Sequence, residues 1–119
     1  MRNREVAAFL DEIADLLELK GESKYRVGAY RTAAGRIENI PEDVEEIWRS
    51  GHLENVPGVG ESIASKVGEY LKTGKSAYLE SLRQEVSPGL RELLKVPGLG
   101  PARAQVIYRN LGITTIPEL

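Results

Sequence analysis

The sequence contains two nearly identical five-residue segments, and this duplication constrains the fold more than any other feature. Segments 56–60 and 96–100 read Val-Pro-Gly-Val-Gly and Val-Pro-Gly-Leu-Gly, and they begin 40 residues apart. An amphipathic segment with helical spacing follows each copy. A Gly-x-Gly turn that opens a helix leaves several backbone N–H groups without intrahelical partners, with the positive end of the helix dipole behind them. Such a turn suits an anion such as a phosphate.

The remainder of the chain reads as helices joined by short turns. Apolar residues recur at helical spacing along 4–20, with Asn3 as the expected N-cap, and along 24–38. Pro41, followed by two acids, predicts the start of a third helix over 41–49. Further helical segments are expected at 51–55, 61–72, 76–86, 88–95 and 101–111. Because no stretch alternates with a period of two, the sequence predicts an all-α helical bundle.

Several turn and end signals accompany these helices. Ser76 and Ser87 precede helical segments and are expected to cap them. Residues 115–119 have the character of a first helical turn at which the sequence stops. We therefore expect the chain to be a fragment of a longer protein.

Composition excludes several kinds of site. The chain has 119 residues, enough for one domain or two small subdomains. It has no cysteine and one histidine, His52, which excludes disulfides, thiolate zinc sites and cysteine nucleophiles and argues against a histidine-based triad. No apolar run could span a bilayer and the N-terminus is not signal-like, so we expect a cytoplasmic monomer with no membrane partner.

The charge is unevenly distributed, although the net charge is only −2. Residues 1–55 carry 8 Lys and Arg against 12 Asp and Glu, whereas residues 56–119 carry 8 against 6. Only the surface that faces a polyanion decides whether it binds, so this balance is compatible with a nucleic-acid partner.

A short helix, a Gly-x-Gly hairpin and a second helix resemble the helix-hairpin-helix DNA-binding motif. The resemblance implies backbone donors that contact DNA phosphates without reading bases. It also implies a monovalent cation, Na⁺ or K⁺, held by hairpin carbonyls. The matching carbonyls belong to Glu54, Val56, Val59, Leu94, Val96 and Leu99. The alternative is that both duplicated segments are tight turns of an all-helical repeat and bind no ligand.

The candidate DNA contacts are the hairpin residues and the cations near them. They are Gly58, Val59, Gly60, Lys66, Lys72, Lys75, Gly98, Gly100, Ala102 and Arg103, to which the family resemblance given next adds Arg26 and Ser62. Each neutralised phosphate releases counterions, so binding should weaken steeply with salt.

The chain is similar to family X DNA polymerases over essentially its whole length. Ala-Tyr-Arg-Thr-Ala-Ala at 29–34, the first hairpin, Leu-Lys-Thr-Gly-Lys at 71–75 and the second hairpin occur in the family's order and spacing. The bacterial and archaeal branch resembles it most. The resemblance implies a lyase-type domain over 1–80 and a truncated start of the polymerase's DNA-binding subdomain over 81–119. It also implies binding of gapped or nicked DNA, including its 5′-phosphate, in base excision repair.

The same resemblance implies that Lys66 could be a Schiff-base nucleophile that removes a 5′-deoxyribose phosphate. Such a lysine must be neutral, so burial or nearby cations must lower its pKa. Tyr30 matches another family site residue. Three positions depart from the family: Ser62 replaces a phosphate-binding lysine, and Tyr25 and Arg26 replace a histidine and a lysine near the pocket entrance.

Three further activities are weighed against DNA binding. Polymerase catalysis needs carboxylates that hold Mg²⁺, and no strand-borne Asp-x-Asp is present, so polymerisation would require a longer parent protein. A helix-hairpin-helix glycosylase is disfavoured because Arg103 lies where a catalytic lysine is needed. A helical protein-interaction module remains the third alternative.

Overall fold

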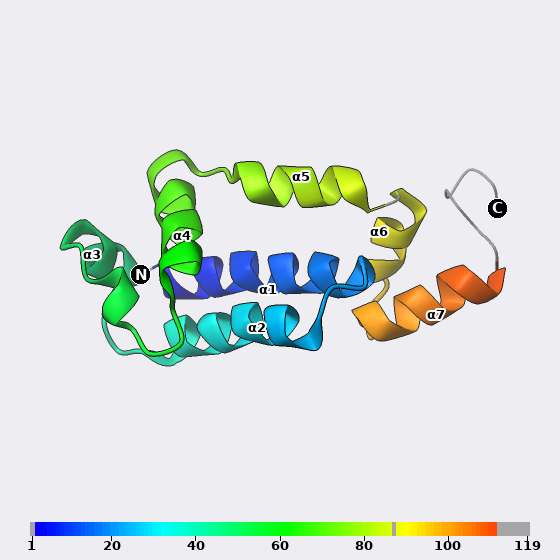
Figure 1. The fold of residues 1–119 in the computed structure, drawn as a ribbon, viewed down its shortest axis with the longest axis horizontal. Helices are drawn as coiled ribbons and strands as arrows, with labels where there is room; N and C mark the ends of the chain where they lie inside the picture. The colour runs from blue at the N-terminus through cyan, green and yellow to red at the C-terminus, as the bar shows by residue number, and fades with distance from the viewer. Residues whose placement is uncertain (1, 87, 112–119) are drawn as a thin grey trace.

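The computed structural model describes the backbone of residues 2–86 and 88–111, in which every regular element is a helix (Figure 1). This confirms the all-α prediction. The elements are α1 (Asn3–Leu19), α2 (Lys24–Asn39), α3 (Val44–Arg49), the 3₁₀ turn η1 (Leu53–Asn55), α4 (Glu61–Thr73), α5 (Ala77–Glu85), α6 (Pro88–Leu94) and α7 (Pro101–Leu111).

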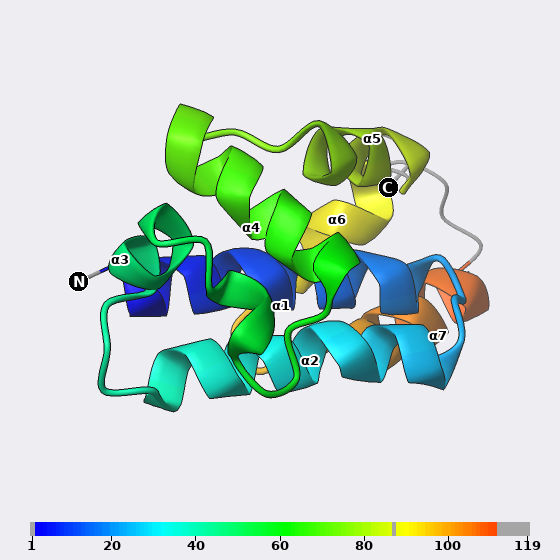
Figure 2. The same cartoon turned by 60° about the vertical axis from the view of Figure 1, so that its left-hand side comes forward.

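Helix α1 is the centre of the core. Its residues Leu10, Ile13 and Leu17 are fully buried, because the helix has neighbours on several sides. Helix α2 runs beside it, α4 crosses over it, and α5 lies along it (Figures 1 and 2). The ring of Phe9 on α1 stacks on Tyr70 of α4, with centroids 4.4 Å apart. The aliphatic core therefore holds α4, and the hairpin before it, at a fixed place on the bundle.

The prediction that Asn3 caps α1 is wrong. Asn3 lies inside the helix and is 95% buried, with an exposed fraction of 5%. Its side-chain amide donates to the carbonyls of Ile37, at 3.2 Å, and Glu42, at 2.7 Å. Its side-chain oxygen accepts from the amide of Val44 at 2.9 Å. Asn3 thus holds the connection between α2 and α3 in place.

Helix α3 begins at Val44, so the predicted start at Pro41 is also wrong. The Asp43 side chain caps it by accepting from the amide of Glu45 at 3.1 Å. Residues 40–43 are not helical, and Asn3 binds the backbone of Glu42 and of Val44, the first helical residue, which holds this connection against α1.

The predicted N-cap at Ser76 is confirmed. Ser76 caps α5 by accepting from the amide of Leu79 at 3.2 Å, and Gly74 ends α4 with a φ of +78°. The predicted cap at Ser87 and the helical turn at 115–119 lie outside the described residues.

The molecule is elongated, with extents of 49 × 24 × 23 Å. The first hairpin, between η1 and α4, and the second, between α6 and α7, lie toward opposite ends of the long axis (Figure 1). No helix among the described residues is long and apolar enough to cross a membrane.

Candidate nucleic-acid interface

The two Gly turns have the same backbone conformation. In each, the amide of the fourth residue donates to the carbonyl of the first at 3.0 Å, from Val59 to Val56 and from Leu99 to Val96. The central glycine has a positive φ in both copies, +87° at Gly58 and +79° at Gly98. A left-handed φ favours glycine because a Cβ would strain it. The sequence duplication is therefore a duplication of structure.

The helix that follows each turn starts in the same way. The carbonyl of the last glycine accepts from the amide four residues on, at 2.8 Å for Gly60 and Ala64 and at 2.9 Å for Gly100 and Ala104. Gly60 is the N-cap of α4 and has no side chain to bond the first amides of the helix. Those amides remain available to an outside acceptor.

Neither backbone strain nor packing requires glycine at these two helix starts. The φ of Gly60 is −84°, which any residue adopts, and a Cβ on Gly60 or Gly100 would meet nothing within 4 Å. A glycine, which has no side chain, would let an anion come close to the helix N-terminus. Both helix starts therefore leave open space at the glycine, where a side chain would be tolerated.

The two hairpins differ in what supports them. A Cβ on Gly58 would lie 3.1 Å from Thr32 Cγ2 and 3.3 Å from Arg36 Cγ, so the first hairpin rests closely on α2 (Figure 2). A Cβ on Gly98 would meet nothing within 4 Å. The first turn is therefore fixed by packing as well as by its own hydrogen bond.

Lys66 lies on α4 beside the first hairpin, in a half-buried position. Its Nζ donates to Ser62 Oγ at 2.8 Å and lies 4.7 Å from the centre of the Tyr78 ring. Burial, and then the positive charge of Arg26, lowers the pKa of Lys66, while Glu69 acts in the opposite direction. A larger fraction of this amine is neutral at a given pH than in an ordinary lysine.

Arg26, Tyr30 and Tyr78 complete the cluster around Lys66. Arg26 Nη2 donates to Tyr78 Oη at 2.5 Å, and the rings of Tyr30 and Tyr78 lie nearly parallel with centroids 6.3 Å apart. Burial raises the pKa of Tyr30 to about 12, so it keeps its proton near neutral pH and cannot act there as an anionic base. The cluster joins α2, α4 and α5.

Tyr78 is the member of this cluster that the sequence did not indicate. It follows Lys66 by 12 residues, beyond a turn, and its spacing in α5 is that of an ordinary core residue. The only available signal was the number of tyrosines and cations among residues 24–31 and 66–78. Their convergence depends on the packing of α5, which no local pattern specifies.

The remaining predicted contacts are dispersed. Lys72 and Lys75 are exposed at the far end of α4, where Lys72 is about 18 Å from Gly60 at 1.5 Å per residue. Ala102 and Arg103 are exposed in the first turn of α7, next to Gly100. The second hairpin thus has an adjacent cation, whereas Lys72 and Lys75 could contact only more distant phosphates.

The hairpin carbonyls fit the implied monovalent cation in one respect. The Val56 and Val96 carbonyls each accept one hydrogen bond, and a carbonyl oxygen has a second lone pair for a cation. Glu54 is the middle residue of η1, before the first turn, and Leu94 is the last residue of α6, before the second turn. Among the described residues, no group of three or more His, Cys, Asp or Glu side chains could hold a metal ion.

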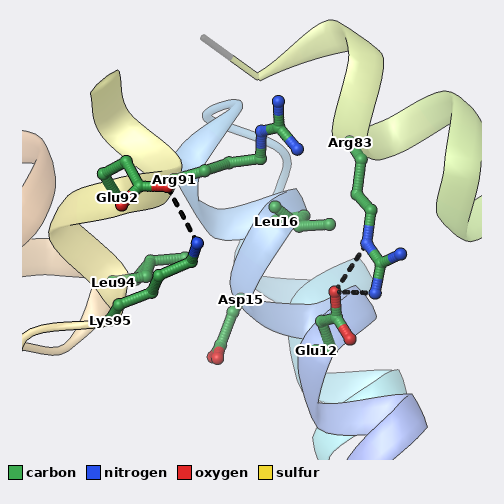
Figure 3. A pocket seen from close by; sticks show the side chains of 8 residues that line it. All are labelled: Glu12, Asp15, Leu16, Arg83, Arg91, Glu92, Leu94 and Lys95. Carbon is green, nitrogen blue, oxygen red and sulfur yellow. Dashed lines mark hydrogen bonds and ion pairs between the residues drawn. The ribbon is translucent and has the colours of Figure 1, made fainter. Parts of the chain in front are cut away.

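A cleft of 420 Å³ lies between α1, α5 and α6, and two of its lining residues, Leu94 and Lys95, directly precede the second hairpin (Figure 3). Its charges are mostly paired with one another: Arg83 donates to Glu12 at 2.7 Å, and Lys95 donates to Glu92 at 2.8 Å. Its Arg91 Nε is buried and has no hydrogen-bond partner in the described part of the chain. Because most of its charges pair with one another, this cleft is a charged seam between the helices.

Two family models match the sequence. Residues 1–76 match a model described as a helix-hairpin-helix domain, and residues 90–119 match a model described as a SAM-like helix-hairpin-helix tandem. Each matched range includes one of the two hairpins. The first range covers more than half of the chain.

Two relatives are similar over nearly all of the chain. DNA polymerase/3′-5′ exonuclease PolX of Bacillus subtilis (strain 168) is 36% identical over 113 residues, which are 95% of this chain and 19% of PolX. DNA polymerase lambda of Arabidopsis thaliana is 28% identical over 118 residues, 98% of this chain and 21% of that polymerase. The chain thus spans about a fifth of the length of these relatives. It belongs to the helix-hairpin-helix domain family, in the form that family X DNA polymerases carry.

Proposed function

We propose that this chain binds DNA through backbone phosphates, without reading base sequence, as part of a family X DNA polymerase. The observation that carries the proposal is the pair of hairpins with matching hydrogen bonds, each opening a helix at a glycine that the fold does not require. The similarity to two DNA polymerases supports it. A phosphate at each helix start would accept hydrogen bonds from its free amides.

The preferred DNA in this proposal is gapped or nicked, with a 5′-phosphate at the downstream end. Half-buried Lys66 and exposed Arg26, which also pairs with Glu22 at 3.2 Å, are two cations in one cluster beside the first hairpin, and a terminal phosphate carries more charge than an internal one. In this proposal the first hairpin binds the strand downstream of the gap and the second binds the strand upstream. A Na⁺ or K⁺ on the hairpin carbonyls would connect each turn to its phosphate.

The proposal is tested by the affinity for gapped DNA with and without the 5′-phosphate, at two salt concentrations. We expect binding that weakens steeply with salt and that is tighter when the phosphate is present. Equal affinity for both ends would refute the role of the Lys66 cluster in end recognition. Absence of binding at low salt would refute DNA binding altogether and favour the alternative of a protein-interaction module.

A second candidate function is a 5′-deoxyribose phosphate lyase, which the lowered pKa of Lys66 favours. The neutral Nζ would add to the C1′ aldehyde of the open sugar, and loss of water would give an imine. Removal of a C2′ proton then breaks the C3′–O bond and releases the DNA with its 5′-phosphate. Hydrolysis of the imine restores the lysine.

Borohydride trapping on a 5′-deoxyribose phosphate end tests this activity. We expect a covalent adduct that is lost in Lys66→Ala and retained in Lys72→Ala, whose lysine is exposed at the opposite end of α4. If the native chain binds this DNA and forms no adduct, Lys66 serves as a phosphate contact and the lyase proposal is wrong.

A further inference from the structure

We propose that the face of α2 beside the first hairpin is a second contact with the DNA backbone, with Arg36 as its phosphate ligand. This inference rests on the proposed function and extends it, because it specifies the path of the bound strand. Neither Arg36 nor this face of α2 belongs to the duplicated segments 56–60 and 96–100.

The geometry places Arg36 directly against the hairpin. A Cβ built on Gly58 would lie 3.3 Å from Arg36 Cγ and 4.0 Å from its Nε. The Arg36 side chain is exposed, so its guanidinium lies next to the turn and reaches solvent. Figure 2 shows the loop between η1 and α4 lying across the middle of α2. A strand that binds the free amides at Gly60 passes within reach of this side chain.

Arg36 differs from its neighbour Arg31 in being free to bind. Arg31 pairs with the carboxylates of Asp15, at 2.7 Å, and Glu18, at 3.2 Å. Arg36 makes no ion pair or side-chain hydrogen bond within the described residues. Both line a shallow groove of 380 Å³ together with Thr32, Gly35, Asn39 and Ile40. The groove therefore offers one uncompensated positive charge beside the hairpin.

The opposite flank of the hairpin is acidic. Glu54 and Glu61 are exposed and line a concavity of 350 Å³ with Trp48 of α3. A DNA strand that ran toward α3 would face two carboxylates, whereas a strand that ran toward α2 would face Arg36. Charge complementarity thus favours a path over α2.

The second hairpin has no such asymmetry. Leu94 and Pro101 stand where the first hairpin has Glu54 and Glu61, and Arg103 follows in the first turn of α7. At these two pairs of equivalent positions, the carboxylates that disfavour a phosphate occur at the first hairpin and not at the second. The positive charge of Arg36 on α2 would offset their effect at that hairpin.

The test is the salt dependence of DNA binding by Arg36→Gln. Loss of one phosphate contact should reduce the slope of log affinity against log salt by about 0.9, which is an affinity loss of about 8-fold near 0.1 M salt. Arg36→Lys should retain the native slope. The matched control is Arg49→Gln on α3, an exposed arginine paired with Glu45 on the acidic side, which should bind as the native chain does.

Because Arg36 is exposed and unpaired, thermal unfolding of Arg36→Gln should match that of the native chain. An unchanged slope in Arg36→Gln, or an equal loss in Arg49→Gln, would overturn the inference. The double variant Gly60→Asp/Gly100→Asp separates this result from failure of the proposed function. If that variant binds poorly while Arg36→Gln binds normally, the hairpins bind DNA and α2 does not. If the double variant also binds normally, DNA binding by the hairpins is itself wrong.

Discussion

The protonation of Lys66 depends on opposing neighbours. The face of the Tyr78 ring favours the ammonium ion, whereas burial and the nearby Arg26 favour the neutral amine. The net result is a lowered pKa. The hydroxyl of Tyr78 also accepts a hydrogen bond from Arg26, so one side chain positions both cations.

Arg26→Gln should raise the pKa of Lys66 toward the ordinary value for lysine, about 10.4. The sign follows from charge: removing a neighbouring cation makes protonation of Lys66 more favourable. The neutral fraction would fall at every pH, and borohydride trapping would need more alkaline conditions. The measurement is an NMR titration of the lysine side chains.

The control for Arg26→Gln is Lys24→Gln, which removes an exposed cation from the same first turn of α2. It should leave the Lys66 titration unchanged. A Lys66 midpoint that stays constant or falls in Arg26→Gln would contradict this account.

Replacing the small side chain of Asn3 should destabilise the fold strongly, because that side chain is buried and bonds to three backbone groups. Asn3→Ala removes hydrogen bonds to two carbonyls and one amide in a buried site, which should lower the free energy of unfolding by about 3 kcal/mol. Urea denaturation measures the change. Asn39→Ala removes an exposed side chain that bonds only within its own helix, and it should cost less than about 1 kcal/mol. Equal costs would contradict the assigned role of Asn3.

The spacing of apolar residues predicted the helices, whereas the role of Asn3 was predicted wrongly. An asparagine before an apolar periodic segment is typical of an N-cap. Its actual partners lie 34 to 41 residues away, and such long-range contacts leave no local signal. Tyr78 was missed for the same reason.

At the scale of elements, the helix–hairpin–helix unit could be predicted because its signals are local. Glycine at a left-handed turn and a helix start without a cap follow from five consecutive residues. The boundaries of α4, α6 and α7 agree with the prediction within one residue. The start of α3 could not be predicted, because Asn3 in another helix binds the backbone that precedes it.

The two hairpin glycines with positive φ should differ in their tolerance of substitution. Gly98→Ala should lower the free energy of unfolding by about 1–2 kcal/mol through backbone strain alone. Gly58→Ala should cost more, because its methyl group also meets Thr32 and Arg36. Chemical denaturation of the two variants checks the order. A larger cost at Gly98 would show that the first hairpin does not rest on α2.

For the whole molecule, the separation of the hairpins makes binding depend on DNA length. They lie within a molecule 49 Å long, so the length of duplex between them is at most about 14 base pairs at 3.4 Å each. We expect affinity and salt slope to rise with duplex length up to about this size. Gly100→Asp, which disables one hairpin, should abolish that rise. Equal length dependence in both proteins would mean that the hairpins do not bind one DNA together.

The arrangement of the two hairpins is the part of the structure that the sequence could not provide. Their separation of 40 residues indicated a repeat, but the distance in space depends on how α5 runs along α1 and how α7 packs at the end of α1. Gln105 on α7 donates to the carbonyl of Leu19 at 3.0 Å, which ties the second hairpin unit to the end of α1.

The double variant Gly60→Asp/Gly100→Asp is the sharpest test of whether the free amides at the two helix starts bind DNA phosphates. Aspartate is a good N-cap with a favourable charge at a helix start, so the double variant should be as stable as the native chain or more so by a few tenths of a kcal/mol. Its carboxylates would occupy the amides and repel phosphate. We predict at least about a 10-fold loss of affinity for gapped DNA and a shallower salt slope. Native affinity and slope in this folded variant would contradict the account.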